Sequence, residues 1–181
     1  MREAAYIIIA LVVLQRLAEL VYAERNTAAL RARGAVEIGR AHYPLIVLLP
    51  AAWLVAVVVM LPKDAPVNWP LIAVFAVLQG LRVWVLATLG PYWTTRIITL
   101  RDAPLVRRGP YRFVRHPNYL VVSAEILVLP LAFGEWAVAA VFTVLNAAML
   151  AWRIRQENQA LLERRALPGP GPDSGAGAAK G

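Results

Sequence analysis

The chain has 181 residues, about the length of one domain, but 60% of them are hydrophobic, which exceeds the ~45–50% usual for soluble globular domains. A water-soluble fold is therefore not expected. The 19 Lys and Arg outnumber the 11 Asp and Glu, and the net charge is +8. Because the basic residues alternate with apolar runs too long to be exposed, nucleic-acid binding is not expected either. The chain contains no cysteine, which excludes disulfides, thiolate nucleophiles and Cys-ligated metal clusters.

Five apolar segments follow the pattern of transmembrane helices, each of which needs about 20 mostly apolar residues. Residues 44–61 form the clearest segment because they carry no charged side chain. The other segments are 4–22, 70–89, 119–133 and 136–152. The sequence therefore predicts an all-α integral membrane protein with about five transmembrane helices. A signal peptide is the alternative for the first segment, but no good cleavage site of small residues follows it.

The last two segments are separated only by Gly134 and Glu135, so the two helices are expected to form a tight hairpin. The fifth helix meets no breaker until about Arg165 and is predicted to extend into the cytosol. We expect one membrane-embedded domain over residues 1–165. A disordered tail rich in Pro, Gly and Ala is expected at 166–181.

The Lys and Arg residues are divided unequally between the two sides of the predicted membrane domain. Fifteen of them lie in 23–43, 90–118 and 153–181, and only Arg2 and Lys63 lie on the other side. Cytoplasmic loops carry an excess of basic residues. The N-terminus is therefore predicted outside and the C-terminus in the cytosol.

Six polar side chains within the apolar segments would all lie in the cytosolic half of the membrane in this orientation. They are Arg16, Glu19, Gln79, Arg82, Glu125 and Asn146. Polar groups at such a depth are costly and usually functional. In the simpler alternative the arginines extend to the interface, Glu19 pairs with Arg16, and Asn146 forms a hydrogen bond between helices. Glu125 would still need a buried partner, such as Arg82 or Arg16, and we therefore expect a polar cavity open to the cytosol, with apolar walls toward the lipid.

An arginine-rich loop leads into the fourth segment with the sequence GPYRFVRHPNYL at residues 109–120. Pro117 suits the first turn of a helix, where its missing N–H costs nothing. The free N–H groups of that turn would lie beside Arg112, Arg115 and His116, in an arrangement that can bind an anion. The alternative is a basic cytosolic loop in which His116 merely caps the helix.

The string Gly-Pro-Tyr-Arg-x-x-Arg-His-Pro-x-Tyr at 109–119 is followed, one helical hairpin later, by Arg153-x-x-x-Glu157. This combination resembles the isoprenylcysteine carboxyl methyltransferase family of integral-membrane methyltransferases. The upstream block that contains Arg16, Glu19 and His42 is similar to a small bacterial branch associated with type III polyketide synthases, whose members methylate phenolic lipids or alkylpyrones. The resemblance implies an S-adenosylmethionine-dependent enzyme in the bacterial plasma membrane. No Gly-x-Gly-x-x-Gly that would indicate a Rossmann cofactor domain follows a strand.

The resemblance also implies where the cofactor binds. In the family, the His-Pro-x-Tyr segment and the cytosolic end of the last helix cover S-adenosylmethionine. The corresponding cofactor-binding residues here are His116, Pro117, Tyr119, Leu120, Arg153, Glu157 and Asn158. Asn158 stands where the family often has a second glutamate, and it brings no charge.

Methyl transfer from a sulfonium needs an aligned nucleophilic oxygen and the exclusion of water, and no metal site is expected. A carboxylate acceptor would need an arginine partner, whereas a phenol, with a pKa of about 10, benefits from a base or a cationic neighbour. The candidate bases are Glu125, Glu19 and His42, and the candidate oxyanion partners are Arg82, Arg16 and Arg115. Among these, Glu125, Arg82 and Arg115 are expected to be catalytic. The residues expected to bind substrate are Arg16, Glu19, His42 and Asn146.

Two other functions stay open. Membrane sterol-reductase-like proteins share a similar Arg-His-Pro-Asn-Tyr string and use NADPH, but in them a Glu typically follows the Tyr by three residues, where this chain has Val122. The second alternative is a non-enzymatic scaffold or transporter subunit, against which stand the motif density of the loop and the lack of an inverted repeat. The acceptor is expected to be a lipophilic small molecule that enters from the membrane lipids. Whether a hydroxyl or a prenylcysteine-type carboxylate is methylated stays open, as does the oligomeric state.

Overall fold

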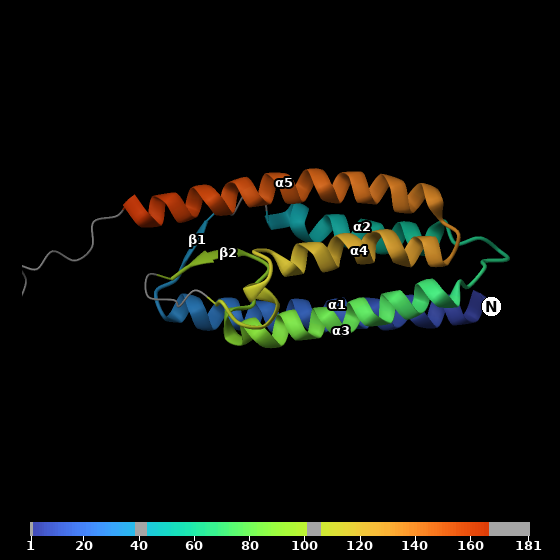
Figure 1. Cartoon of the computed structure of the whole chain (residues 1–181), viewed down its shortest axis with the longest axis horizontal. Helices are drawn as coiled ribbons and strands as arrows, with labels where there is room; N and C mark the ends of the chain where they lie inside the picture. The colour runs from blue at the N-terminus through green and yellow to red at the C-terminus, as the bar shows by residue number, and fades with distance from the viewer. Residues whose placement is uncertain (1, 39–42, 101–105, 167–181) are drawn as a thin grey trace, which may run out of the picture.

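The computed structural model describes residues 2–38, 43–100 and 106–166, most of which lie in five α-helices (Figure 1). The helices are α1 Arg2–Ala32, α2 Tyr43–Val59, α3 Trp69–Leu89, α4 Pro117–Ala132 and α5 Trp136–Ala166. Two short 3-10 helices, η2 Gly90–Tyr92 and η3 Gly109–Arg112, and two strands, β1 Val36–Ile38 and β2 Ile97–Thr99, complete the order. The predicted disordered tail lies outside the described residues, apart from Ala166, which ends α5.

Within the described residues, three helices are long and apolar enough to cross a membrane, namely Arg2–Ala32, Trp69–Tyr92 and Trp136–Gln156. The helices α2 and α4 are also apolar, but they have only 17 and 16 residues. The chain is therefore an all-α membrane protein, as predicted, while five crossings stay a prediction. The segment that is clearest by composition, 44–61, forms one of the shorter helices because α2 ends at Val59.

The helix ends differ from the predicted ones mainly in α1. This helix runs ten residues beyond the predicted end at residue 22 and stops at Ala32, before Gly34 at φ +84°. The extension lies outside the apolar stretch, so hydropathy alone does not show it. The continuation of α5 past Trp152 and the tight α4–α5 hairpin are both confirmed, and Gly134 allows the turn at φ +78°.

The helices form two layers with roughly parallel axes, α2, α4 and α5 in one and α1 and α3 in the other (Figure 1). All five contribute to a core of buried apolar side chains, which includes Ala5, Ile9, Trp53, Val57, Phe75, Leu129, Phe133 and Val138. Many other large apolar side chains are exposed on the outer faces, among them Ile7, Leu11, Val77 and Val144. Helices that are apolar on both faces are typical of membrane bundles.

The two strands form a small antiparallel ribbon that the sequence analysis did not predict. Val36 lies opposite Thr99, and the ribbon is joined to α1 by charged side chains. Arg96 donates to Glu24 at 3.1 Å and to Glu37 at 2.9 Å, and Glu37 also pairs with Arg31. The ribbon lies toward the end of the bundle opposite the N-terminus (Figure 1), and we call this end the ribbon end.

The Gly-Pro-Tyr-Arg segment packs against the end of α3. Gly109 has φ +56°, and a Cβ at this position would lie 2.6 Å from Thr88 Oγ1. Only glycine adopts this conformation easily and leaves room for Thr88. The following Pro110 is buried. The segment that leads into α4 is therefore fixed by close packing.

Glu135, in the α4–α5 hairpin, is 5% exposed, and neither carboxylate oxygen has a hydrogen-bond partner in the described part of the chain. Burial raises the pKa of Glu135 from 4.5 to about 7. Because the folded protein holds this proton more tightly than the unfolded chain, the stabilisation is complete below pH 4.5 and is lost as the pH rises through about 7.

Glu135→Gln is therefore expected to reduce the loss of thermal stability between about pH 5 and pH 8. A neutral amide needs no proton in the folded state, and the variant should melt roughly 2–4 °C above the wild type at pH 8, the shift that about 1 kcal/mol produces in a chain of this size. The measurement is the melting temperature in detergent at a series of pH values. Glu3→Gln, at an exposed position, is the control, and a Glu135→Gln curve parallel to the wild type would contradict the prediction.

Candidate active site

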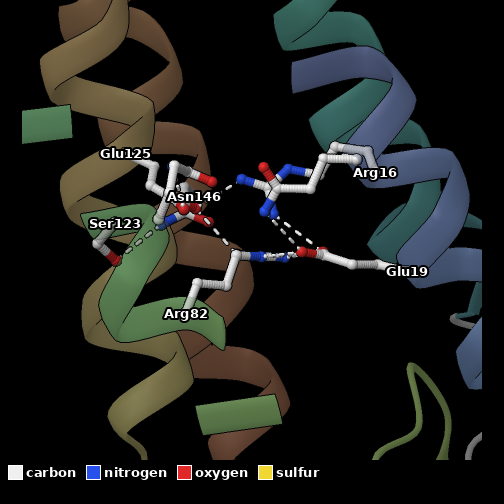
Figure 2. A network of polar contacts seen from close by, with 8 residues as sticks. Arg16, Glu19, Arg82, Ser123, Glu125 and Asn146 are labelled. Atoms are coloured by element: carbon white, nitrogen blue, oxygen red, sulfur yellow. Dashed lines mark hydrogen bonds and ion pairs between the residues drawn. The ribbon is translucent and has the colours of Figure 1, made fainter. Parts of the chain in front are cut away.

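Four charged side chains meet in a buried cluster between three helices (Figure 2). Arg16 and Glu19 come from α1, Arg82 from α3 and Glu125 from α4. Glu125 Oε2 accepts hydrogen bonds from Arg16 Nη2 at 2.8 Å and from Arg82 Nη1 at 2.9 Å. Glu19 Oε2 accepts from Arg16 Nη1 at 3.0 Å and from Arg82 Nη2 at 2.7 Å. The two positive and two negative charges balance one another.

The spacing of residues along α1 explains why the two cluster residues of this helix lie together. Arg16 and Glu19 are three residues apart, so they lie on the same face of α1. On α3, Gln79 lies three residues before Arg82, and its amide donates to Glu125 Oε1 at 2.8 Å. Glu125 is 1% exposed, and each of its oxygens is hydrogen-bonded. Glu125 therefore has two of the buried partners expected for it, Arg16 and Arg82. Neither guanidinium extends to the membrane interface instead of making this contact.

Asn146 does not join the charged cluster. It is buried on α5, and its Nδ2 donates to Ser123 Oγ on α4 at 3.0 Å (Figure 2). This is the hydrogen bond between helices that the sequence analysis gave as the simpler alternative. A role for Asn146 in substrate binding stays a prediction, and Asn146 is not among the residues that line the cavity.

A cavity of about 400 Å³ lies beside the cluster. Residues from all five helices and from the loop after η2 line it, including Leu17, Leu20, Val47, Pro50, Trp53, Leu54, Trp93, Asn118, Tyr119, Ile126, Met149 and Arg153. All four residues of the charged cluster, Arg16, Glu19, Arg82 and Glu125, also line it. The walls are mainly apolar and the charged side chains occupy one part of them, as expected of a cavity that combines polar groups with apolar walls. Its opening to the cytosol stays a prediction.

At the ribbon end of the cavity, the start of α4 meets α5. Pro117 is the first residue of α4 and is buried, as expected for the first turn. The ring of His116 stacks on Tyr119 with centroids 5.1 Å apart, and the Arg153 guanidinium carbon lies 5.6 Å from the centre of the Tyr119 ring. The side chain of His116 makes no capping hydrogen bond with α4. The His-Pro-x-Tyr segment and Arg153, which belong to the two parts of the sequence motif, are therefore in contact.

Other residues predicted for the site lie elsewhere or outside the description. Arg115 and Leu120 are exposed and do not line the cavity. Glu157 and Asn158 lie on α5 about one turn beyond Arg153, but their side chains are outside the described part of the structure, and His42 is outside it altogether. The roles of these residues stay predictions.

The sequence analysis missed several polar residues of the cavity wall, and three of them have unpaired polar atoms in the described part of the chain. Trp53, Trp93 and Asn118 line the cavity, and each has a buried polar atom, Nε1, Nε1 and Oδ1 respectively, without a hydrogen-bond partner in the described part of the chain. A signal for Trp53 was present in the sequence, because it is the only residue with a polar side-chain atom between Pro44 and Val59. Unsatisfied polar atoms on a cavity wall are positions at which a ligand can form hydrogen bonds.

Comparison with known proteins adds to this geometry. Residues 71–163 match the model of the isoprenylcysteine carboxyl methyltransferase (ICMT) family. The "Uncharacterized protein YpbQ" of Bacillus subtilis (strain 168) is 37% identical over 162 residues, which cover 87% of this chain and 96% of that protein. An "Uncharacterized protein" of Haemophilus influenzae is 26% identical over 145 residues, 76% of this chain and 83% of that protein. No solved structure matches the chain.

Proposed function

Because the chain belongs to the isoprenylcysteine carboxyl methyltransferase family and is thus a membrane methyltransferase, we propose that it methylates an oxygen of a lipophilic acceptor with S-adenosylmethionine. The observation that carries this proposal is a cavity that connects the Tyr119–Arg153 contact with the charged cluster between mainly apolar walls. The proposed acceptor is a phenolic lipid or an alkylpyrone hydroxyl. An isoprenylcysteine-type carboxylate is the alternative.

Three residues at the ribbon end are suited to hold the cofactor, which when bound supplies an electrophilic methyl group on a positively charged sulfur. Arg153 can pair with a carboxylate, and the aromatic face of Tyr119 can lie against a cation. Asn118 Oδ1, which is buried without a partner in the described part of the chain, can accept hydrogen bonds from an amino group. The donor set therefore fits a zwitterionic, sulfonium-bearing cofactor.

The charged cluster is suited to the acceptor oxygen. As a hydroxyl loses its proton, the guanidinium groups of Arg16 and Arg82 can stabilise the developing negative charge, and Glu19 or Glu125 can take up the proton. The apolar walls exclude water and so strengthen these electrostatic interactions. In this proposal Arg82 and Glu125 are catalytic, and Arg16 and Glu19 bind the acceptor.

The proposal also includes the directions from which the cofactor and the acceptor enter the cavity. With the N-terminus outside a bacterial plasma membrane and the C-terminus in the cytosol, the ribbon end faces the cytosol. The water-soluble cofactor would enter there, and the lipophilic acceptor would enter sideways from the bilayer.

Calorimetric titration of the detergent-purified protein with S-adenosylhomocysteine tests the proposed function, with NADPH as the paired ligand. We expect S-adenosylhomocysteine to bind with one site per chain and NADPH not to bind. Binding of NADPH alone would instead support a sterol-reductase-like enzyme. Binding of neither ligand, in a protein that melts cooperatively, would favour a non-enzymatic membrane protein.

A further inference from the structure

Within the described residues, Trp53 has an unpaired hydrogen-bond donor beside the cavity. Its side chain is 2% exposed, it lines the cavity, and its Nε1 has no partner in the described part of the chain. Buried indole N–H groups usually have a partner, and leaving such a group unsatisfied costs about 1–3 kcal/mol. From Pro44 to Val59, α2 carries no other polar side-chain atom. Among these residues of α2, the indole N–H of Trp53 is therefore the only side-chain hydrogen-bond donor.

The position of Trp53 separates it from the cofactor end and places it near the level of the charged cluster. The helices α2 and α4 begin at about the same level (Figure 1). Trp53 lies ten residues after Tyr43, and Glu125 lies eight residues after Pro117, which places them about 15 Å and 12 Å along their helices. Trp93, the other indole of the cavity, lies beyond the end of α3, at the ribbon end.

We propose that Trp53 binds the lipophilic acceptor and that its indole N–H donates a hydrogen bond to an oxygen of the acceptor head group. This inference rests on the proposed function and deepens it. The acceptor is then a lipid whose head carries an oxygen that accepts a hydrogen bond at the level of the charged cluster. The apolar residues Pro50 and Leu54, which line the cavity on the same helix, contact its hydrocarbon part.

The first test compares the wild type with Trp53→Phe, which keeps an aromatic ring but removes the donor. The probe is 5-pentadecylresorcinol, and the measurements are KM for its methylation and Kd for S-adenosylhomocysteine. We expect KM to rise roughly five- to tenfold, as the loss of one hydrogen bond predicts, with Kd unchanged. Trp136→Phe, at a 72% exposed position, is the matched control and should change neither value. An unchanged KM in Trp53→Phe, as expected if the indole only bound a buried water, would overturn the inference.

A second test needs no turnover, and its first comparison uses the wild type alone. The wild type is melted with 1,3-dimethoxy-5-pentadecylbenzene, whose ether oxygens accept hydrogen bonds, and with pentadecylbenzene, which has no oxygen. We expect the dimethoxy compound to raise the melting temperature more, and we expect Trp53→Phe to remove the difference. Equal shifts in the wild type would overturn the inference even if Trp53→Phe failed to fold.

The experiments distinguish failure of the inference about Trp53 from failure of the proposed function. If S-adenosylhomocysteine binds the wild type but the oxygen-bearing probes are neither methylated nor stabilising, the inference about Trp53 is overturned and the proposed function stands. If S-adenosylhomocysteine does not bind, the proposed function is overturned, and the inference that rests on it is overturned too.

Discussion

Glu125→Leu is expected to lower the free energy of unfolding by about 3–5 kcal/mol, the usual cost of removing one partner from a buried ion pair, and to abolish methyl transfer. The carboxylate of Glu125 accepts hydrogen bonds from Arg16, Gln79 and Arg82. Without it, two guanidinium groups share the single charge of Glu19 inside a membrane bundle. The measurements are the melting temperature in detergent and the rate of methyl transfer. A Glu125→Leu variant with normal stability and full activity would contradict both the structural and the catalytic role of the cluster.

A compensating substitution separates stability from activity. Removing Arg16 together with Glu125 leaves Glu19 and Arg82, which are joined by hydrogen bonds of 2.7 to 2.9 Å and are neutral as a pair. The double variant Arg16→Leu/Glu125→Leu is therefore expected to be more stable than Glu125→Leu alone, while it stays inactive. If the double variant were less stable than Glu125→Leu, the loss of charge balance would not be the reason why Glu125→Leu is destabilised.

The sequence was sufficient to predict the depth of the polar side chains but not the direction in which each one faces. Depth follows from counting residues along a helix, and this predicted that Arg16, Arg82 and Glu125 would lie close together. The rotation of each helix about its own axis depends on packing. Asn146 has a similar predicted depth to Glu125, yet it faces Ser123 rather than the charged cluster.

The same limit explains the residues that the sequence analysis missed. An indole in an apolar helix can face lipid, as the exposed Trp84 does, or a cavity, as Trp53 does, and composition does not distinguish the two cases. The β1–β2 ribbon consists of three-residue strands, which are too short for an alternating pattern to be recognised.

The matched family region covers only part of the cavity. It spans residues 71–163 and so includes Arg82, Tyr119 and Glu125, whereas Arg16 and Trp53 lie in the preceding helices. In the proposed function the family region supplies the cofactor end, and α1 and α2 supply much of the acceptor end. Differences in acceptor among family members would then depend on residues of these two helices.

Tyr119→Leu is expected to weaken the binding of S-adenosylhomocysteine by roughly tenfold or more. The centre of the Tyr119 ring lies 5.1 Å from that of the His116 ring and 5.6 Å from the Arg153 guanidinium carbon, so leucine removes the surface that both side chains contact. A contact of a cation with an aromatic ring contributes about 0.5–2 kcal/mol, and the leucine exchange removes both the ring that Arg153 contacts and the ring proposed to lie against the sulfonium. Calorimetry gives the affinity, and the melting temperature shows whether the bundle is intact.

Tyr119→Phe is the matched control, because phenylalanine keeps the ring that contacts His116 and Arg153. It should lose much less affinity than the leucine variant, and both variants should melt close to the wild type, since Tyr119 is only partly buried in the first turn of α4. Equal affinity in the wild type and Tyr119→Leu would place the cofactor away from this contact. Equal losses in both variants would instead assign the effect to the phenol hydroxyl, because only the leucine exchange removes the ring.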